Sequence, residues 1–161
     1  MSVPGDRVRR ATIPRDECLG LLRHAEYARV VISVRCLPAA LPARIAVVDD
    51  HALLLASAEE AVVVAARRGD VLSVQIDGLE PDGATWSVMA SGIAAMPTGD
   101  PALSGPLTRA VAGGATLIAL PLTIVSGERI GYRRPVWENW PCPSTGSPIP
   151  SGSTRCSTPS C

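Results

Sequence analysis

Histidine and cysteine are the residue types most suited to bind a metal or act as nucleophiles, and their spacing here supports neither role. The sequence has two histidines and five cysteines, and no two cysteines show C-x-x-C spacing. A zinc site therefore has no support, and we expect no metal. Cys18 and Cys36 are interpreted as small buried apolar residues with free thiols, because the adjacent sequence indicates no electropositive setting. The sequence identifies no catalytic residue.

The carboxylates and histidines do not form an acid–base pair either. Residues 49–50 and 59–60 are adjacent acidic pairs, and neighbouring side chains of a strand or helix point apart, unlike the facing carboxylates of a glycosidase. His51 falls in a predicted turn, where we expect exposure to solvent rather than a role as a base. His24 lies near the end of a predicted helix, where histidine suits the negative end of the helix dipole. Neither histidine is therefore interpreted as catalytic: His51 is expected to be an exposed turn residue and His24 a helix cap.

The charge balance and the absence of several motifs exclude or weaken further classes of function. The 161-residue chain balances fifteen basic residues, all of them arginine, against fifteen acidic ones. The absence of lysine removes Schiff-base chemistry and a P-loop lysine, and the balance leaves no broad surface for nucleic acid. No G-x-G-x-x-G, G-x-S-x-G or H-E-x-x-H string occurs, which weakens dinucleotide-fold, hydrolase and zinc-protease interpretations.

The sequence also lacks the signs of secretion or membrane insertion. Its first residues carry charges and no apolar stretch, which is unlike a secretory signal. The long uncharged run over 110–127 contains two adjacent glycines and a proline, which weaken it as a membrane span. We expect a soluble, cytoplasmic protein with no membrane contact.

Periodicity predicts the elements that would position any site. An apolar stripe at i, i+3, i+4 and i+7 predicts a helix that begins near Pro14, and alanine and glutamate predict a second helix over 58–67. Residues 100–112 form a helix or an irregular connection. About six strands with helices inserted at two points favour a mainly β fold, a closed antiparallel barrel in which Gly92 marks a bulge or a corner. Seven candidate segments supply these strands, at 28–35, 40–48, 52–57, 71–77 and 85–96, with 116–125 and 129–133 as closing strands.

Composition divides the chain into three parts. Residues 1–12 are polar and arginine-rich and are expected to form a flexible N-terminal arm, and residues 13–134 form the barrel domain. Residues 135–161 hold six prolines, six serines and three cysteines. Such a segment buries too little apolar surface to offset its ordering entropy, so we predict a disordered tail. An out-of-frame or artefactual end remains the alternative.

Four strings in a fixed order carry a family resemblance. They are ECLGLLRHAEYARVVISV (17–34), LPARIAVVDDHALLLAS (41–57), AARRGDVLSVQID (65–77) and TWSVMASGIA (85–94). Together they resemble the pyridoxamine 5′-phosphate oxidase-like family of flavin-binding split barrels. The resemblance implies a six-stranded antiparallel split β-barrel that forms a homodimer, with flavin mononucleotide (FMN) in a groove between the subunits.

The resemblance also implies a site. The flavin ring would lie against the backbone of Ala43, Arg44 and Ile45, with Arg44 donating to it. Arg44 could equally be an outward-facing strand residue, since every other residue of a strand points outside. The basic residues that usually grip the phosphate in this family fall here at Ala56 and Val62, which offer no charge.

Other residues would have to replace that phosphate grip. Ser57 supplies one hydroxyl, and Arg67 or Arg68 lies at the end of the second predicted helix. Glutamates at 59 and 60 would repel an anion from the start of that helix. Trp86 would wall the groove, although a large aromatic residue there also suits core or dimer packing.

Two functions follow as expectations. The first is an FMN-dependent oxidoreductase that passes hydride to a small organic acceptor, which needs no catalytic triad because the cofactor carries the redox step. The alternative is a split-barrel dimer that binds a deazaflavin coenzyme, or is non-catalytic, after losing the usual FMN phosphate site.

Overall fold

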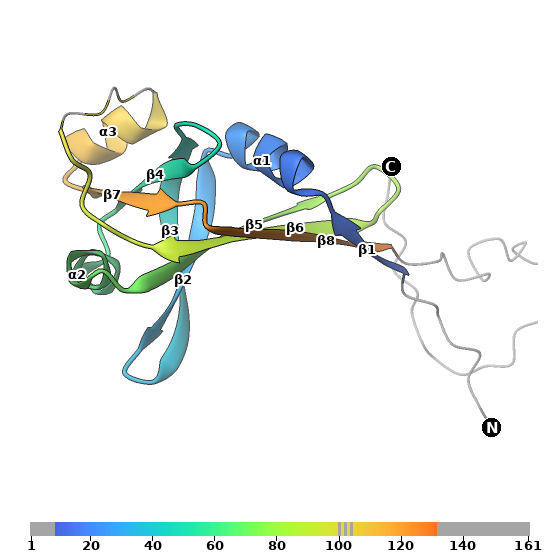
Figure 1. The fold of residues 1–161 in the computed structure, drawn as a ribbon, viewed down its shortest axis with the longest axis horizontal. Coiled ribbons are helices and arrows are strands. Elements are labelled where there is room, and N and C mark those ends of the chain that lie inside the picture. The colour runs from blue at the N-terminus through green and yellow to red at the C-terminus, as the bar shows by residue number, and fades with distance from the viewer. Residues whose placement is uncertain (1–8, 100, 102, 104, 132–161) are drawn as a thin grey trace, which may run out of the picture.

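A single curled sheet of antiparallel strands with three helices makes up the part of the chain that the structure describes (Figure 1). The structure is a computed structural model and describes residues 9–99, 101, 103 and 105–131. The expected 135–161 tail and the first eight residues of the expected arm lie outside these residues. The elements are β1 (Arg9–Ile13), α1 (Arg15–His24), β2 (Tyr27–Val34), β3 (Leu37–Val47), β4 (Ala52–Ser57), α2 (Glu60–Arg68), β5 (Val71–Leu79), β6 (Thr85–Ile93), α3 (Pro106–Ala112), β7 (Thr116–Pro121) and β8 (Ile124–Gly131).

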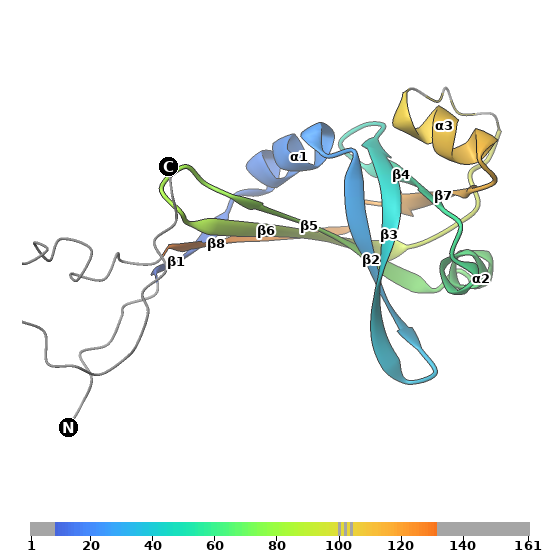
Figure 2. The same cartoon turned by 180° about the vertical axis from the view of Figure 1, so that it is seen from behind.

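The sheet closes on itself through six of its strands. The strand order is β1-β8-β6-β5-β2-β3-β4-β7, and β7 meets the chain that leaves β6 through a bridge between Ala95 and Ala119. Strands β2 to β7 therefore form a barrel, while β8 and β1 extend the sheet beyond β6. Figure 2 shows the β2–β3 hairpin crossing the long β5, β6 and β8 strands. The predicted antiparallel split barrel is confirmed, with two strands more than expected.

The barrel interior follows from the alternation of apolar residues. Ala28, Val30 and Ile32 of β2 point into the same core as the alternate apolar residues of β5 and β6. Cys18, Leu19 and Leu22 bury one face of α1 in this core. Val62 and Val63 of α2 are also buried, so core burial outweighs the weak helix propensity of consecutive valines.

Strand β4 differs because it is buried on both faces. Its run from Leu53 to Ser57 carries no charge, and each of these residues is buried. Leu53 and Leu55 face the main core, whereas Leu54 and Ala56 pack with Leu107 of α3 in a second apolar cluster. Helix α3 therefore covers the outer side of β3 and β4, and a continuous apolar run is the expected signature of a strand covered on both sides.

Three details differ from the sequence-based expectations. Residues 9–12, expected in a loose arm, belong to β1, which pairs along its whole length with β8. The last two strands meet at residues 122–123 rather than near 126, and the Leu122 N–H donates to the His51 carbonyl there. The β2–β3 turn places Arg35 and Cys36 at φ values of 50° and 65°. Two such residues make a tight hairpin turn without the usual Asn-Gly signal.

Gly92 lies at the barrel corner and forms no bulge. It pairs in unbroken register with Leu72 of β5. A Cβ at this position would overlap the carbonyl oxygen of Pro121, so glycine permits the close approach of β6 and β7. In the described part of the chain, no helix is long and apolar enough to cross a membrane.

Candidate functional site

The barrel opens where β2 and β5 separate. The two strands pair over Arg29–Val31 and Ser73–Gln75 and then diverge. A cleft of about 430 Å³ lies at this split, with walls from α1, β2 and β5 and with Trp86 of β6 at its edge. A second groove of about 560 Å³ continues from it along β6 and β8 and shares Arg29, Asp77 and Trp86 with it. We call the two together the Trp86 cleft.

Polar side chains in the Trp86 cleft hold one another in place. Arg29 Nη1 lies 3.1 Å from Asp77 Oδ2. Gln75 Nε2 donates to Asp77 Oδ1 at 2.8 Å and to Ser87 Oγ at 3.2 Å. An indole ring beside an oriented guanidinium and an amide can hold a planar aromatic ligand by stacking and by hydrogen bonds at its edge.

A third, smaller pocket lies on the outer face where α3 crosses β3. It has a volume of about 260 Å³, and its lining among the described residues consists of Arg44, Pro106, Arg109 and Ala110. Arg44 pairs with Tyr27 of β2, and Tyr27 also lines the Trp86 cleft. The Arg44–Tyr27 pair therefore connects this pocket with the Trp86 cleft across the outer face of β3 and β2.

The three predicted ring-binding residues point to opposite faces of β3. Ala43 and Ile45 are buried in the barrel core, whereas Arg44 is exposed on the outer face with its side chain half accessible. A ring lying on the outer face could meet the backbone of all three residues but only the Arg44 side chain. The predicted ring position stays a prediction.

The residues predicted to replace the phosphate grip do not gather around Arg44. Ser57 is buried, and its Oγ accepts a hydrogen bond from the Glu59 N–H at 3.2 Å. Arg67 and Arg68 are exposed in the last turn of α2, which lies apart from α3, although Figure 1 shows both helices at the same end of the molecule. Trp86 lines the cleft at the β2–β5 split and not the pocket at Arg44. The structure therefore brings Arg44 together with Arg109 instead.

The sequence did not predict that Arg29, Asp77 and Arg109 belong to these sites. Strand alternation could place Arg29 and Asp77 outside, but their ion pair depends on the β2–β5 register, which joins segments more than forty residues apart. Arg109 lies in the segment 100–112, for which the sequence predicted either a helix or an irregular connection. Its position beside Arg44 comes from the packing of α3 on β3.

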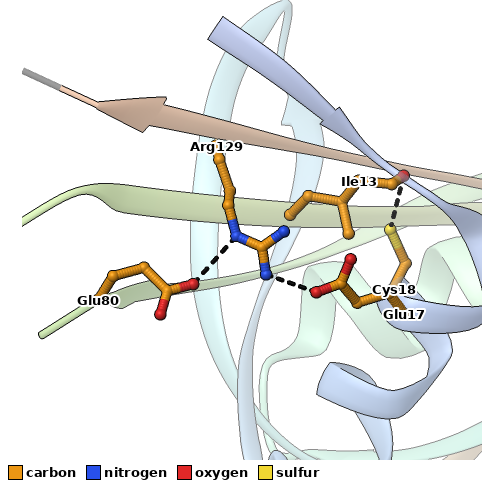
Figure 3. Close-up of polar contacts among 5 residues, drawn as sticks. All are labelled: Ile13, Glu17, Cys18, Glu80 and Arg129. Atoms are coloured by element: carbon orange, nitrogen blue, oxygen red, sulfur yellow. Dashed lines mark hydrogen bonds and ion pairs between the residues drawn. The ribbon is translucent and has the colours of Figure 1, made fainter. Parts of the chain in front are cut away.

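A separate polar cluster around Arg129 is structural (Figure 3). Arg129 Nη2 lies 2.6 Å from Glu17 Oε1 of α1, and its Nε lies 3.0 Å from Glu80 Oε1, which follows β5. The hydrogen bond from Arg129 lowers the pKa of Glu17, and the hydrogen bonds to both carboxylates raise the pKa of Arg129. The arginine thereby ties α1 and the β5–β6 connection to β8.

The cysteines and histidines add no reactive centre to this picture. Burial raises the pKa of Cys18, whose Sγ donates to the Ile13 carbonyl at 3.5 Å, so its thiol stays protonated near neutral pH. The expectation that Cys36 is buried is wrong, because the β2–β3 turn carries it into solvent. His24 Nδ1 lies 2.8 Å from the Gly20 carbonyl oxygen within α1. No cluster of three potential metal ligands occurs within the described residues.

This architecture defines a class of protein, the split β-barrel: six antiparallel strands closed into a barrel that opens between two of them. The chain belongs to the pyridoxamine 5′-phosphate oxidase family, whose family model matches residues 14–104, more than half of its length. The match spans α1 through β6 and includes the Trp86 cleft residues of β2, β5 and β6.

One sequence relative is a protein of Mycobacterium tuberculosis (strain ATCC 25618 / H37Rv), named uncharacterized protein Rv0080. It is 36% identical over an alignment of 87 residues, and the match covers 51% of this chain and 57% of that protein. The matched region thus covers little more than half of each chain.

Solved structures show the same fold at low sequence identity. An FAD-binding protein from Mycobacterium smegmatis has a TM-score of 0.56 at 20% identity, with 75% of this chain and 98% of that chain covered. An FAD-binding protein from Mesorhizobium loti has a TM-score of 0.60 at 18% identity, with 78% and 99% covered. An FAD and heme binding protein from Mycobacterium smegmatis has a TM-score of 0.55 at 15% identity, with 93% and 92% covered.

Proposed function

We propose that this chain is a flavin-dependent oxidoreductase that binds FMN or a related flavin nucleotide and reduces a small organic acceptor. Membership of the pyridoxamine 5′-phosphate oxidase family carries the proposal. The similar folds of proteins named as FAD-binding support it. A bound reduced flavin would supply the hydride, that is, two electrons and one proton.

The described residues fit a flavin nucleotide in two respects. The Trp86 cleft offers an indole and fixed hydrogen-bonding groups for an aromatic ring, and the pocket at Arg44 and Arg109 offers positive charge for a phosphate. The two phosphate positions that the family resemblance implies do not fit. Ala56 and Val62 are 3% and 0% exposed and are packed among apolar side chains.

The chain's own residues would bind and orient the cofactor rather than transfer protons to the substrate. Tyr27 faces outward beside Arg44 of β3 and lines the Trp86 cleft, where its side chain can contact the edge of a flavin ring. Gln75 is already oriented by Asp77 and Ser87, so its place at the cleft is fixed before a ligand arrives. These two bonds use both Nε2 hydrogens, so Gln75 would offer its Oε1 to the ligand as an oriented hydrogen-bond acceptor.

We propose a homodimer that uses the outer face of β5, β6 and β8. Val71, Ile93 and Ile124 are 67%, 61% and 64% exposed on this face, and Met89 lies among them. Several exposed large apolar residues on one face of a sheet are typical of a protein interface. A second copy seated there would bury these residues and cover the outer face beside the Trp86 cleft, which would exclude water from it.

The second candidate is a split-barrel dimer that has lost the usual FMN site and binds a deazaflavin coenzyme or has no cofactor. Its supporting observation is that the two expected phosphate positions are buried and apolar. Titration of the purified protein with FMN, FAD and the deazaflavin coenzyme separates the candidates. Saturable change in the visible absorbance of FMN or FAD supports the flavin enzyme, and a response to the deazaflavin coenzyme alone supports the second candidate.

A further inference from the structure

We propose that Arg44 and Arg109 form a phosphate-binding site, which replaces the family's usual phosphate grip and takes the phosphate of the flavin nucleotide. The inference rests on the proposed function and adds a residue, Arg109, to it. It concerns an outer-face pocket separate from the Trp86 cleft, of about 260 Å³, between β3 and α3.

The strand register places Arg44 beside the position of the lost grip. Ala56 is the Cα partner of Arg44 on the neighbouring strand, so the two residues share the outer face. Ala56 itself is covered by Leu107 of α3. A phosphate excluded from Ala56 by this helix meets, one strand away, an arginine whose side chain is half exposed.

The packing of α3 brings the second guanidinium to the same place. Leu107, Ala110 and Val111 lie at i, i+3 and i+4 and pack toward β3 and β4. Pro106, Arg109 and Ala110 have the same spacing on the adjoining stripe of the helix, which lines the pocket. The contact that anchors α3 therefore also fixes the base of the Arg109 side chain beside Arg44.

The chemistry of the pocket suits a phosphate. The guanidinium groups of Arg44 and Arg109 repel each other, so an anion between them is favourable. The described residues that line the pocket include no carboxylate that would neutralise them. Glu26 Oε2 lies 3.9 Å from Arg44 Nη1, but both side chains are at least half exposed, so this ion pair competes weakly with a dianion. Arginine binds phosphate through two parallel N–H donors, which gives stronger recognition than a single charge.

The test compares FMN with riboflavin, which has the same ring and no phosphate. We would measure the dissociation constants of both by flavin fluorescence for the wild type and for Arg44→Gln and Arg109→Gln. The control Arg35→Gln removes the same charge at the far end of the β2–β3 hairpin. Each pocket variant should weaken FMN binding about tenfold, since a hydrogen bond to a charged group contributes on that order. Neither variant should change riboflavin binding, and the control should change neither ligand.

Two outcomes would overturn the inference while leaving flavin binding intact. One is an equal loss of FMN and riboflavin affinity in the pocket variants, and the other is equal affinity of the wild type for both ligands. A wild type that binds no flavin would instead defeat the proposed function.

Inorganic phosphate tests the site without any flavin. Titration into the wild type should shift the side-chain Nε–H NMR signals of Arg44 and Arg109 and not that of Arg35. Unshifted signals would contradict a phosphate site. Shifts combined with equal FMN and riboflavin affinities would assign the pocket to a free phosphate anion and overturn its assignment to the flavin.

Discussion

The indole of Trp86 lies directly over the backbone of Gly78, its Cα partner on β5, so closely that a Cβ at residue 78 would overlap the ring. Glycine therefore makes room for the tryptophan at the point where the Trp86 cleft begins. Both residues line the groove along β6 and β8. Trp86 can therefore take this position only because its partner on β5, Gly78, has no side chain.

Gly78→Ala is expected to displace Trp86 and lower the free energy of unfolding by about 1–3 kcal/mol, the usual effect of overpacking. Urea unfolding measures this change. The matched control is Gly20→Ala in α1, where nothing lies within 4 Å of the added Cβ. That control should raise stability by about 1 kcal/mol through helix propensity. Equal effects of the two substitutions would contradict the overlap at Gly78.

Much of the fold could be predicted because its signals are local. The periodic stripe in α1, the alternation in β5 and the continuous apolar run in β4 each identify an element from adjacent residues. Strand β1 could not be predicted in this way. Its five residues are mostly polar and exposed, and they form a strand only because β8 lies beside them. Its hydrogen bonds join residues near opposite ends of the described chain.

The same distinction between local signals and contacts of distant residues applies to the candidate site. The exposure of Arg44 follows from the alternation of Ala43, Arg44 and Ile45 along one strand. The partnership of Arg44 with Arg109 depends on where α3 packs, and a seven-residue helix has too little local pattern to indicate that. The burial of Ala56 by Leu107 has the same non-local origin.

The Arg129 cluster should make stability depend on acidic pH. Arg129 lowers the pKa of Glu17 in the folded protein. The Glu17–Arg129 ion pair therefore contributes to the free energy of unfolding at pH values above the ordinary glutamate pKa of about 4.3. This contribution is lost below that value, as the pH falls through the lowered pKa of folded Glu17. Arg129→Gln should therefore be less stable than the wild type at pH 7, and the difference should shrink at pH 3. Urea unfolding at both pH values measures it, and a constant difference would contradict the linkage.

The two described cysteines should differ in reactivity. Burial raises the pKa of Cys18, whereas Cys36 is exposed at the β2–β3 turn. Because the thiolate is the reactive form, iodoacetamide at pH 8 should modify Cys36 many times faster than Cys18. Peptide mapping by mass spectrometry measures both rates in one sample. In urea the two rates should converge, and equal rates in the folded protein would contradict the burial of Cys18.

Ile93→Glu tests the proposed dimer surface. Ile93 is 61% exposed on this surface, so the substitution should leave the fold intact and place a desolvated charge in the interface. Analytical ultracentrifugation should show a dimeric wild type and a monomeric variant. Leu37→Glu, at an equally exposed apolar residue of the β2–β3 hairpin, is the control and should remain dimeric. A monomeric wild type would contradict the proposal.

Gel filtration in buffer that contains FMN tests whether this protein binds a flavin. We expect FMN to co-elute with the protein at about one flavin per chain and the complex to elute as a dimer. Elution of the folded protein without FMN, and equally without FAD, would contradict flavin binding and leave the barrel as a fold that functions without a flavin.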